Sequence, residues 1–378
     1  MQPMLVAFAV SVVFTLLLVR SAKVHAHRSG DRDFSKPQKF HAVAVPRIGG
    51  LSIVLALICA CLVIGYEHGA PSGRLGLLLM LCAAPAFLAG FVQDLTEAVT
   101  PRGRLVATAV SAALAFHFMD AAIRYTAIPG LDWLVGFWFG SLVLTVFAVA
   151  GIANALNIID GFNGLASMCA MLMLAAIAYV GFQVDDSLIA LLSLAGIGAV
   201  LGFFLWNFPS GLIFLGDGGA YFLGFFVAEV SILLLVRNPE VSPIFPLLVC
   251  IYPVFETLFS IYRRWFLRQQ PAHMPDGIHL HSLVYRRVMR WAVGDRSVQA
   301  LTKRNSRTSP VLWALCMCSI VPAMAFWDST VTLGAFLLVF ALLYLGLYWG
   351  IVRFRSPRLL LMLGPRRAKP DACDNRRK

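Results

Sequence analysis

Residues 154–165, Asn-Ala-Leu-Asn-Ile-Ile-Asp-Gly-Phe-Asn-Gly-Leu, form the most polar break between two long apolar runs of the chain. The break contains no Lys or Arg and a single acid, which is unusual for a loop in water. On a helix, Asn154, Asn157 and Asp160 recur every three residues and share one face. The two glycines that follow allow the backbone to turn or to approach a ligand closely. The stretch therefore predicts a hydrogen-bonding, acid-bearing end of a buried helix.

The composition around this break is that of an integral membrane protein. Hydrophobic residues make up 59% of the 378 residues and charged residues 13%, whereas a soluble domain has about 45–50% apolar and about 25% charged residues. We predict an all-α fold with one multi-pass domain over 1–355, which includes a loop at 263–308, and a basic tail over 356–378. A span needs about 20 apolar residues, and eleven runs qualify, near 3–19, 48–66, 75–93, 105–123, 133–153, 164–183, 187–206, 219–236, 242–262, 310–327 and 331–352.

Basic residues predict the orientation of these helices. If the N-terminus is outside, only Arg74, Arg124 and Arg237 of the 31 Lys and Arg lie outside as well, as the positive-inside rule expects. The C-terminus is then cytoplasmic, and the net charge of +12 lies in loops and tail, where it favours anionic lipid over nucleic acid. No basic segment precedes the first run, so we expect a first helix and not a cleaved signal peptide. This topology places residues 93–94, 154–165, 215–219 and 263–308 together on the cytoplasmic side.

Asp217 is a candidate metal ligand, because it stands between glycines in Gly216-Asp217-Gly218-Gly219. Alone, it could simply cap the helix that follows. With Asp94 and Asp160 on the same face of the membrane, it predicts a shared Mg²⁺ site. Mg²⁺ is held in proteins by a few carboxylates together with substrate phosphate oxygens and water.

The loop at 263–308 carries His279, His281, Arg286 and Arg287, which could bind a diphosphate. An incidental or structural His pair is the alternative, and a zinc site is not expected without nearby Cys or further His.

Gly49 and Gly50 begin the second apolar run, where they could admit a phosphate or permit tight helix packing. Glu229 and Glu256 lie within predicted spans, so each must face protein or water. Each is either a functional residue or a residue that packs against a neighbouring helix.

Taken together, these residues resemble the polyprenyl-phosphate N-acetylhexosamine-1-phosphate transferase family. The resemblance implies a multi-pass enzyme that moves a sugar-1-phosphate from a UDP-sugar to polyprenyl (undecaprenyl) phosphate. It implies release of UMP at the cytoplasmic face of the bacterial inner membrane and the start of lipid-linked glycan synthesis, as for O-antigen or other envelope polysaccharides. The matching segments are Pro46–Gly50, Asp94, Asn154–Gly164, Phe214–Gly219, the Pro253, Glu256 and Arg263-Arg264 region, and His279-Leu280-His281.

The resemblance also implies roles for single residues. Asp217, Asp160 and Asn157 would hold Mg²⁺, with Mn²⁺ as a substitute, Asp94 would lie by the lipid phosphate, and His279 would contact the diphosphate. Implied catalytic residues are Asp94, Asp160, Asp217 and His279, and implied substrate-binding residues are Asn154, Asn157, Gly49, Gly50, His281, Arg286 and Arg287. The partners would be a UDP-N-acetylhexosamine of the GlcNAc type, polyprenyl phosphate and the membrane, with no nucleic acid and with room for a homodimer.

Three positions depart from the family pattern. Gln93 replaces one of two paired acids, Asn163 replaces a second acid after Asp-Gly, and Ser282 replaces a final histidine. They leave open a relative that has lost catalysis and serves in assembly. A second alternative is a secondary transporter, since eleven spans with Glu229 and Glu256 could house a proton-coupled site.

Overall fold

The computed structural model describes residues 1–21, 45–267, 278–289 and 298–353, and every regular element in these ranges is a helix. Within them, nine helices are long and apolar enough to cross a membrane. The chain is therefore a multi-pass, all-helical membrane protein. The nine are α1 (Gln2–Arg20), α3 (Gly50–His68), α4 (Ala70–Thr96), α7 (Trp138–Ile159), α8 (Leu165–Gln183), α9 (Ser187–Asn207), α10 (Gly216–Arg237), α15 (Val298–Ala325) and α16 (Thr330–Val352).

Two further predicted spans form helices that do not reach the length and hydropathy shared by these nine. The span predicted at 105–123 corresponds to α5 (Pro101–Met119), and the one at 242–262 is divided into α11 (Phe245–Val249) and α12 (Ile251–Tyr262). The division lies four residues before Pro253, whose ring disfavours a continuous helix at that distance. The count of eleven spans and the orientation of the termini remain predictions, and the tail at 356–378 lies outside the described residues.

The last part of the segment predicted as a cytoplasmic loop, 263–308, is helical, because α15 already begins at Val298. Its first turns are polar, and hydropathy alone could not identify them as helix. They are held by contacts from another part of the chain, since Asn305 and Ser309 both hydrogen-bond to Asn163.

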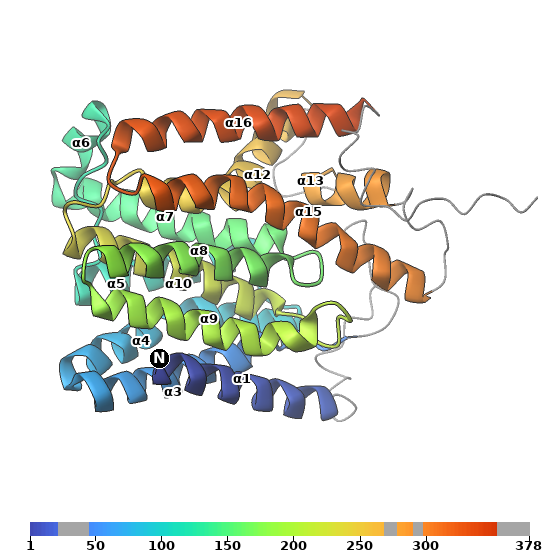
Figure 1. The fold of residues 1–378 in the computed structure, drawn as a ribbon, viewed down its shortest axis with the longest axis horizontal. Helices are drawn as coiled ribbons and strands as arrows, with labels where there is room; N and C mark the ends of the chain where they lie inside the picture. Colours follow the sequence, from blue (N-terminus) through green and yellow to red (C-terminus); the bar gives the residue numbers. More distant parts are fainter. Residues whose placement is uncertain (22–44, 268–277, 290–297, 354–378) are drawn as a thin grey trace, which may run out of the picture.

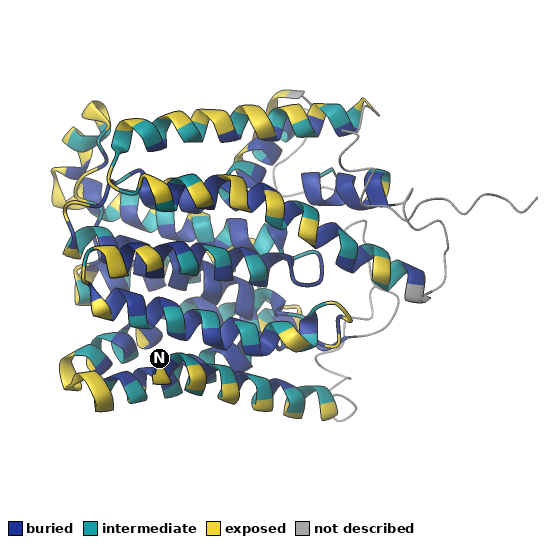
Figure 2. Cartoon of the chain, viewed as in Figure 1, coloured by how far each residue is buried: buried dark blue, intermediate teal, exposed yellow. Residues whose placement is uncertain are grey.

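Helix α10 lies at the centre of the bundle. In its most apolar 18-residue window 89% of the residues are buried, against 17% for α16, and Figure 2 shows the exposed surface concentrated on the outer helices. Small residues let neighbouring helices touch its backbone. Gly218 lies against Gly90 of α4, and Gly224 lies against Ala153 of α7. Such close approach is typical of helix packing in membranes.

The long helices run side by side, so their ends gather at two ends of the molecule (Figure 1). Two short elements mark these ends: α6 (Pro129–Val135) lies at one and α13 (Leu280–Leu283) at the other. The C-terminal ends of α4 and α7 meet the N-terminal ends of α5 and α10 through the hydrogen bonds described below. The polar segments at 93–94, 154–165 and 215–219 therefore share one end, as the topology predicted.

Candidate active site

The site is built around the first turn of α10. Gly216 has a φ of +79°, a conformation that favours glycine, and it lies against the backbone of Arg47. Gly218 and Gly219 pack directly on the backbones of α4 and α3. The three glycines leave Asp217 as the one side chain of this turn, and it is partly exposed.

Asp94, at the end of α4, caps this turn from outside the helix. Its two carboxylate oxygens accept the backbone N–H groups of Asp217 and Gly218, each at 2.9 Å. An anion at a helix N-terminus satisfies unpaired amides and interacts favourably with the helix dipole. The capping role considered for Asp217 is thus filled by Asp94, and the carboxylate of Asp217 is directed to other partners.

Those partners come from α5 and α7. Arg104 forms an ion pair with one oxygen of Asp217, and the side-chain amide of Asn157 donates to the other oxygen at 3.0 Å. The hydroxyl of Tyr221, one turn further along α10, donates to Asn154 at 3.0 Å. Asn154 and Asn157 therefore face α10 together, which confirms that they share one helix face.

Asp160 follows directly after the last residue of α7. Burial, and then the nearby carboxylate of Asp217, raise the pKa of Asp160 to about 7, while Arg47 opposes the shift. The carboxylate of Asp217 is thus near enough to disfavour the ionisation of Asp160. A bound cation between them would relieve this repulsion.

The donor chemistry fits Mg²⁺. Asp217 and Asp160 offer carboxylate oxygens and Asn157 an amide oxygen, which are the ligands that this hard cation prefers. In the part of the chain that the structure describes, no group of three or more His, Cys, Asp or Glu is arranged to hold a metal. Here the guanidinium of Arg104 supplies the positive charge at Asp217.

The His-x-His segment lies against the loop that follows α7. The ring of His279 stacks on that of His281, with centroids 5.0 Å apart, and His281 meets the edge of Phe162 at 5.6 Å. Because Phe162 is two residues from Asp160, the histidines reach the neighbourhood of the acidic residues. Both histidines are buried.

The two predicted arginines of this region differ in their surroundings. Arg287 donates to the carbonyl groups of Ile351 and Val352 at the end of α16, at 3.0 and 2.5 Å, so its guanidinium caps that helix. Arg286 is exposed at the preceding position. No described contact joins either of them to Asp217.

Gly49 and Gly50 act in helix packing in this structure. Their N–H groups donate to the carbonyl groups of Phe214 and Leu215 at 3.0 and 2.9 Å, and an added Cβ at Gly50 would clash with Gly219. These amides are therefore already used within the protein. A role for Gly49 and Gly50 in substrate binding remains a prediction, whereas their role in helix packing is supported by these contacts.

Two departures from the family pattern have structural explanations. Gln93 accepts the N–H of Val99 at 2.8 Å and so shapes the turn between α4 and α5. Asn163 is buried, and its side-chain amide donates to the carbonyl of Pro209 at 3.0 Å. A carboxylate at residue 163 could not make that donation. Ser282, the third departure, is also buried.

Arg104 and Tyr221 are not among the residues that the sequence predicts for the site. A signal for Arg104 was present, since a cation in the first turn of a helix is unfavourable to the helix dipole and calls for a nearby acid. Besides its ion pair, Arg104 lies over the ring of Tyr221, 5.6 Å from its centroid. Both residues therefore belong to the wall of the site around Asp217.

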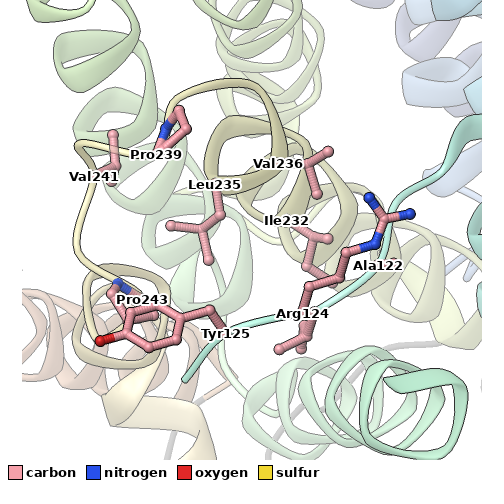
Figure 3. Close-up of a pocket in the computed structure, with 10 residues that line it drawn as sticks. Ala122, Arg124, Tyr125, Ile232, Leu235, Val236, Pro239, Val241 and Pro243 are labelled. Carbon is pink, nitrogen blue, oxygen red and sulfur yellow. The ribbon is translucent and has the colours of Figure 1, made fainter. Parts of the chain in front are cut away.

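Two features lie away from this cluster. Glu229 is fully buried three turns further along α10, and its carboxylate has no hydrogen-bond partner among the described residues. A cavity of about 200 Å³ lies near the C-terminal end of α10, lined by residues 122–125, Ile232, Leu235 and Val236, and the segment 239–243. Figure 3 shows Arg124 and Tyr125 on its wall. Since Asp217 is at the other end of α10, this cavity is separate from the acidic site.

The chain is similar to several known proteins. Residues 76–235 match the model of glycosyl transferase family 4. The chain is 30% identical over 279 residues to a "probable undecaprenyl-phosphate N-acetylglucosaminyl 1-phosphate transferase" of Bacillus subtilis, covering 73% of this chain and 75% of the relative. It is 28% identical to the undecaprenyl-phosphate alpha-N-acetylglucosaminyl 1-phosphate transferase of Thermotoga maritima, with 74% and 81% covered. It is 29% identical to the phospho-N-acetylmuramoyl-pentapeptide-transferase of Geobacillus kaustophilus, with 61% and 74% covered. The chain therefore belongs to glycosyl transferase family 4.

Proposed function

We propose that this protein transfers an N-acetylhexosamine-1-phosphate from a UDP-sugar to polyprenyl phosphate and releases UMP. The observation that carries the proposal is the convergence of Asp94, Arg104 and Asn157, from three helices, on the first turn of α10 at Asp217. Phosphoryl transfer depends chiefly on alignment and on neutralising charge, and acids, amides and guanidinium groups supply both. The names of the relatives support undecaprenyl phosphate as the acceptor and a GlcNAc-type donor.

The residues have distinct roles in this proposal. Asp217, Asp160 and the amide oxygen of Asn157 would hold Mg²⁺, which would supply positive charge to neutralise the donor diphosphate. Arg104 adds positive charge beside the reacting phosphates, and Asp94 keeps the first turn of α10 in place. The lipid phosphate is already mostly a dianion at neutral pH, because its second pKa is about 6. It therefore needs no dedicated general base.

The proposal places the site at the cytoplasmic face of a bacterial inner membrane, in an eleven-helix topology with an external N-terminus. The distribution of Lys and Arg supports this orientation. The His279-Leu280-His281 segment, which is not a triple histidine, supports a GlcNAc-type donor over a muramyl-pentapeptide donor.

An assay with purified protein tests the proposal. Labelled UDP-N-acetylglucosamine, undecaprenyl phosphate and Mg²⁺ should give a lipid-linked sugar and an equal amount of UMP. Asp217→Asn should lower the rate by about 10²–10³-fold, the cost of losing one such electrostatic contact, whereas Asp120→Asn, an exposed acid outside the site, should retain it.

Other outcomes separate the alternatives. A panel of UDP-sugars that yields neither lipid product nor UMP rules out the transferase. Wild-type behaviour in Asp217→Asn would favour a role in assembly, and accumulation of substrate in sealed vesicles by that variant would favour a transporter.

A further inference from the structure

Glu229 and Glu256 are carboxylates buried within helices away from the acidic site, and their surroundings differ. Glu229 makes no hydrogen bond to the described residues, whereas Glu256, which is 1% exposed, binds the His-x-His segment. Its Oε1 atom accepts the N–H of Leu280 at 2.8 Å and lies 3.1 Å from Nδ1 of His279. A carboxylate from α12 thus holds both the backbone and the ring of a predicted substrate-binding residue.

This contact determines which nitrogen of His279 carries a proton. A backbone N–H is always a donor, so Oε1 of Glu256 acts as an acceptor, and Nδ1 of His279 must donate to it. The other ring nitrogen, Nε2, is then the atom left for a further partner. When both ring nitrogens carry protons, Nδ1–H donates to Glu256 and Nε2–H is the donor left for a phosphate oxygen.

The same segment is held from a second direction. Arg263 donates to the carbonyl of Ile278 and to the hydroxyl of Tyr348 on α16, both at 2.7 Å. The stacked ring of His281 lies between His279 and Phe162 of the α7–α8 loop. The segment 278–281 is therefore fixed to α12 and α16 on one side and contacts the loop of Asp160 on the other.

We propose that Glu256 is a positioning residue for the transfer reaction: by accepting from Nδ1–H it fixes the ring of His279 so that Nε2–H is presented as a donor to the diphosphate of the nucleotide sugar. This role rests on the proposed function, in which His279 contacts that diphosphate. It accounts for a buried acid that the acidic site itself does not use.

The substitution Glu256→Gln tests the role with little change in shape. A Gln oxygen in the place of Oε1 can still accept from Leu280 and from His279, but the negative charge is gone, so a charge-assisted hydrogen bond to the ring is replaced by a weaker neutral one. We expect kcat/KM for the UDP-sugar to fall by about 10–100-fold, the usual effect of losing a partner that orients a functional histidine. The fall should come from a higher KM for the UDP-sugar, while KM for polyprenyl phosphate stays the same.

This KM difference separates positioning from loss of folded protein. A variant that folds in lower yield has a lower apparent kcat with both KM values unchanged, and that result would overturn the proposal. If Glu256→Gln gives no monodisperse protein, Glu256→Asp takes its place, because it keeps the carboxylate at shorter reach. An unchanged KM for the UDP-sugar in Glu256→Asp would then overturn the proposal.

A double-mutant cycle with His279→Ala shows whether Glu256 acts through the histidine. The second substitution should add less than about threefold to the first, and fully multiplicative effects would contradict the proposal. Glu229→Gln, the same change at the other buried carboxylate, is the matched control and should keep wild-type KM values. Wild-type protein that makes no product would disprove the proposed function, whereas active wild-type and an equally active Glu256→Gln would disprove the positioning role alone.

Discussion

Arg104 and Asp217 form an ion pair that joins the first turn of α5 to the first turn of α10. The guanidinium is mostly buried, and its Nε–H has no acceptor among the described residues. Arg104 thus places a positive charge at the carboxylate that we propose as the principal metal ligand. A metal ion and this guanidinium would compete for the same oxygen.

Arg104→Gln should therefore strengthen metal binding. Removal of the competing charge is expected to raise the affinity for Mn²⁺ by about 5- to 150-fold, the range of a coupling of about 1–3 kcal/mol. The electron paramagnetic resonance signal of free Mn²⁺ in a titration of purified protein measures this affinity. Arg102→Gln removes an exposed charge two residues away and serves as the control. An affinity that is unchanged or lower in Arg104→Gln would show that the two cations do not compete.

Asp94 should contribute to stability through the cap that it gives to α10. Asp94→Ala removes both acceptors of the amides of Asp217 and Gly218 and should cost about 0.5–2 kcal/mol, as the loss of a helix cap does. Asp94→Asn keeps one acceptor, so its melting temperature in detergent should lie between those of Asp94→Ala and the wild type. Asp120→Asn, which breaks an exposed pair with Arg124, should have little effect. Equal melting temperatures for the two Asp94 variants would contradict this order.

Asn163→Asp, which restores the acid of the family pattern, should destabilise this protein. The change replaces the amide that donates to Pro209 with an acceptor, and it buries a charge. We expect a loss of about 1–3 kcal/mol, the cost of leaving a buried polar group unpaired. The control is Gln183→Glu, which makes the same kind of change at an exposed amide. Thermal unfolding of the two variants gives the comparison. A melting temperature for Asn163→Asp as high as that of the control would show that the site tolerates the acid.

Asp186 should make stability depend on pH in the acid range. Burial by itself raises the pKa of Asp186, but hydrogen bonds from Arg237 and Asn238 outweigh it and leave the pKa below its usual value. A depressed pKa stabilises the folded state above the unfolded pKa of about 3.9. That contribution is lost as the pH falls through the lower, folded pKa.

Melting curves of wild type and Asp186→Asn between pH 7 and pH 3 measure this effect. The wild type should be the more stable protein at pH 7, and the difference should shrink below about pH 4. A difference that stays constant over the whole range would contradict the assignment.

The sequence predicted those parts of the site that depend on helical periodicity and on topology. The spacing of Asn154 and Asn157 gave their common face, and the alternation of spans brought Asp94 and Asp217 to the same end. The roles of Gln93 and Asn163 could not be predicted, because their hydrogen bonds join them to segments whose positions depend on the tertiary fold. The early start of α15 was missed for the same reason, since its polar first turns are held by contacts with Asn163.

The central position of α10 has a consequence for biosynthesis. Asp94, Arg104 and Asn157 are all synthesised before Asp217, the residue around which they gather. A nascent chain that ends before residue 216 therefore carries a buried acid, a cation and an amide whose common partner does not yet exist. The site can therefore assemble only once α10 has inserted among helices that are already made.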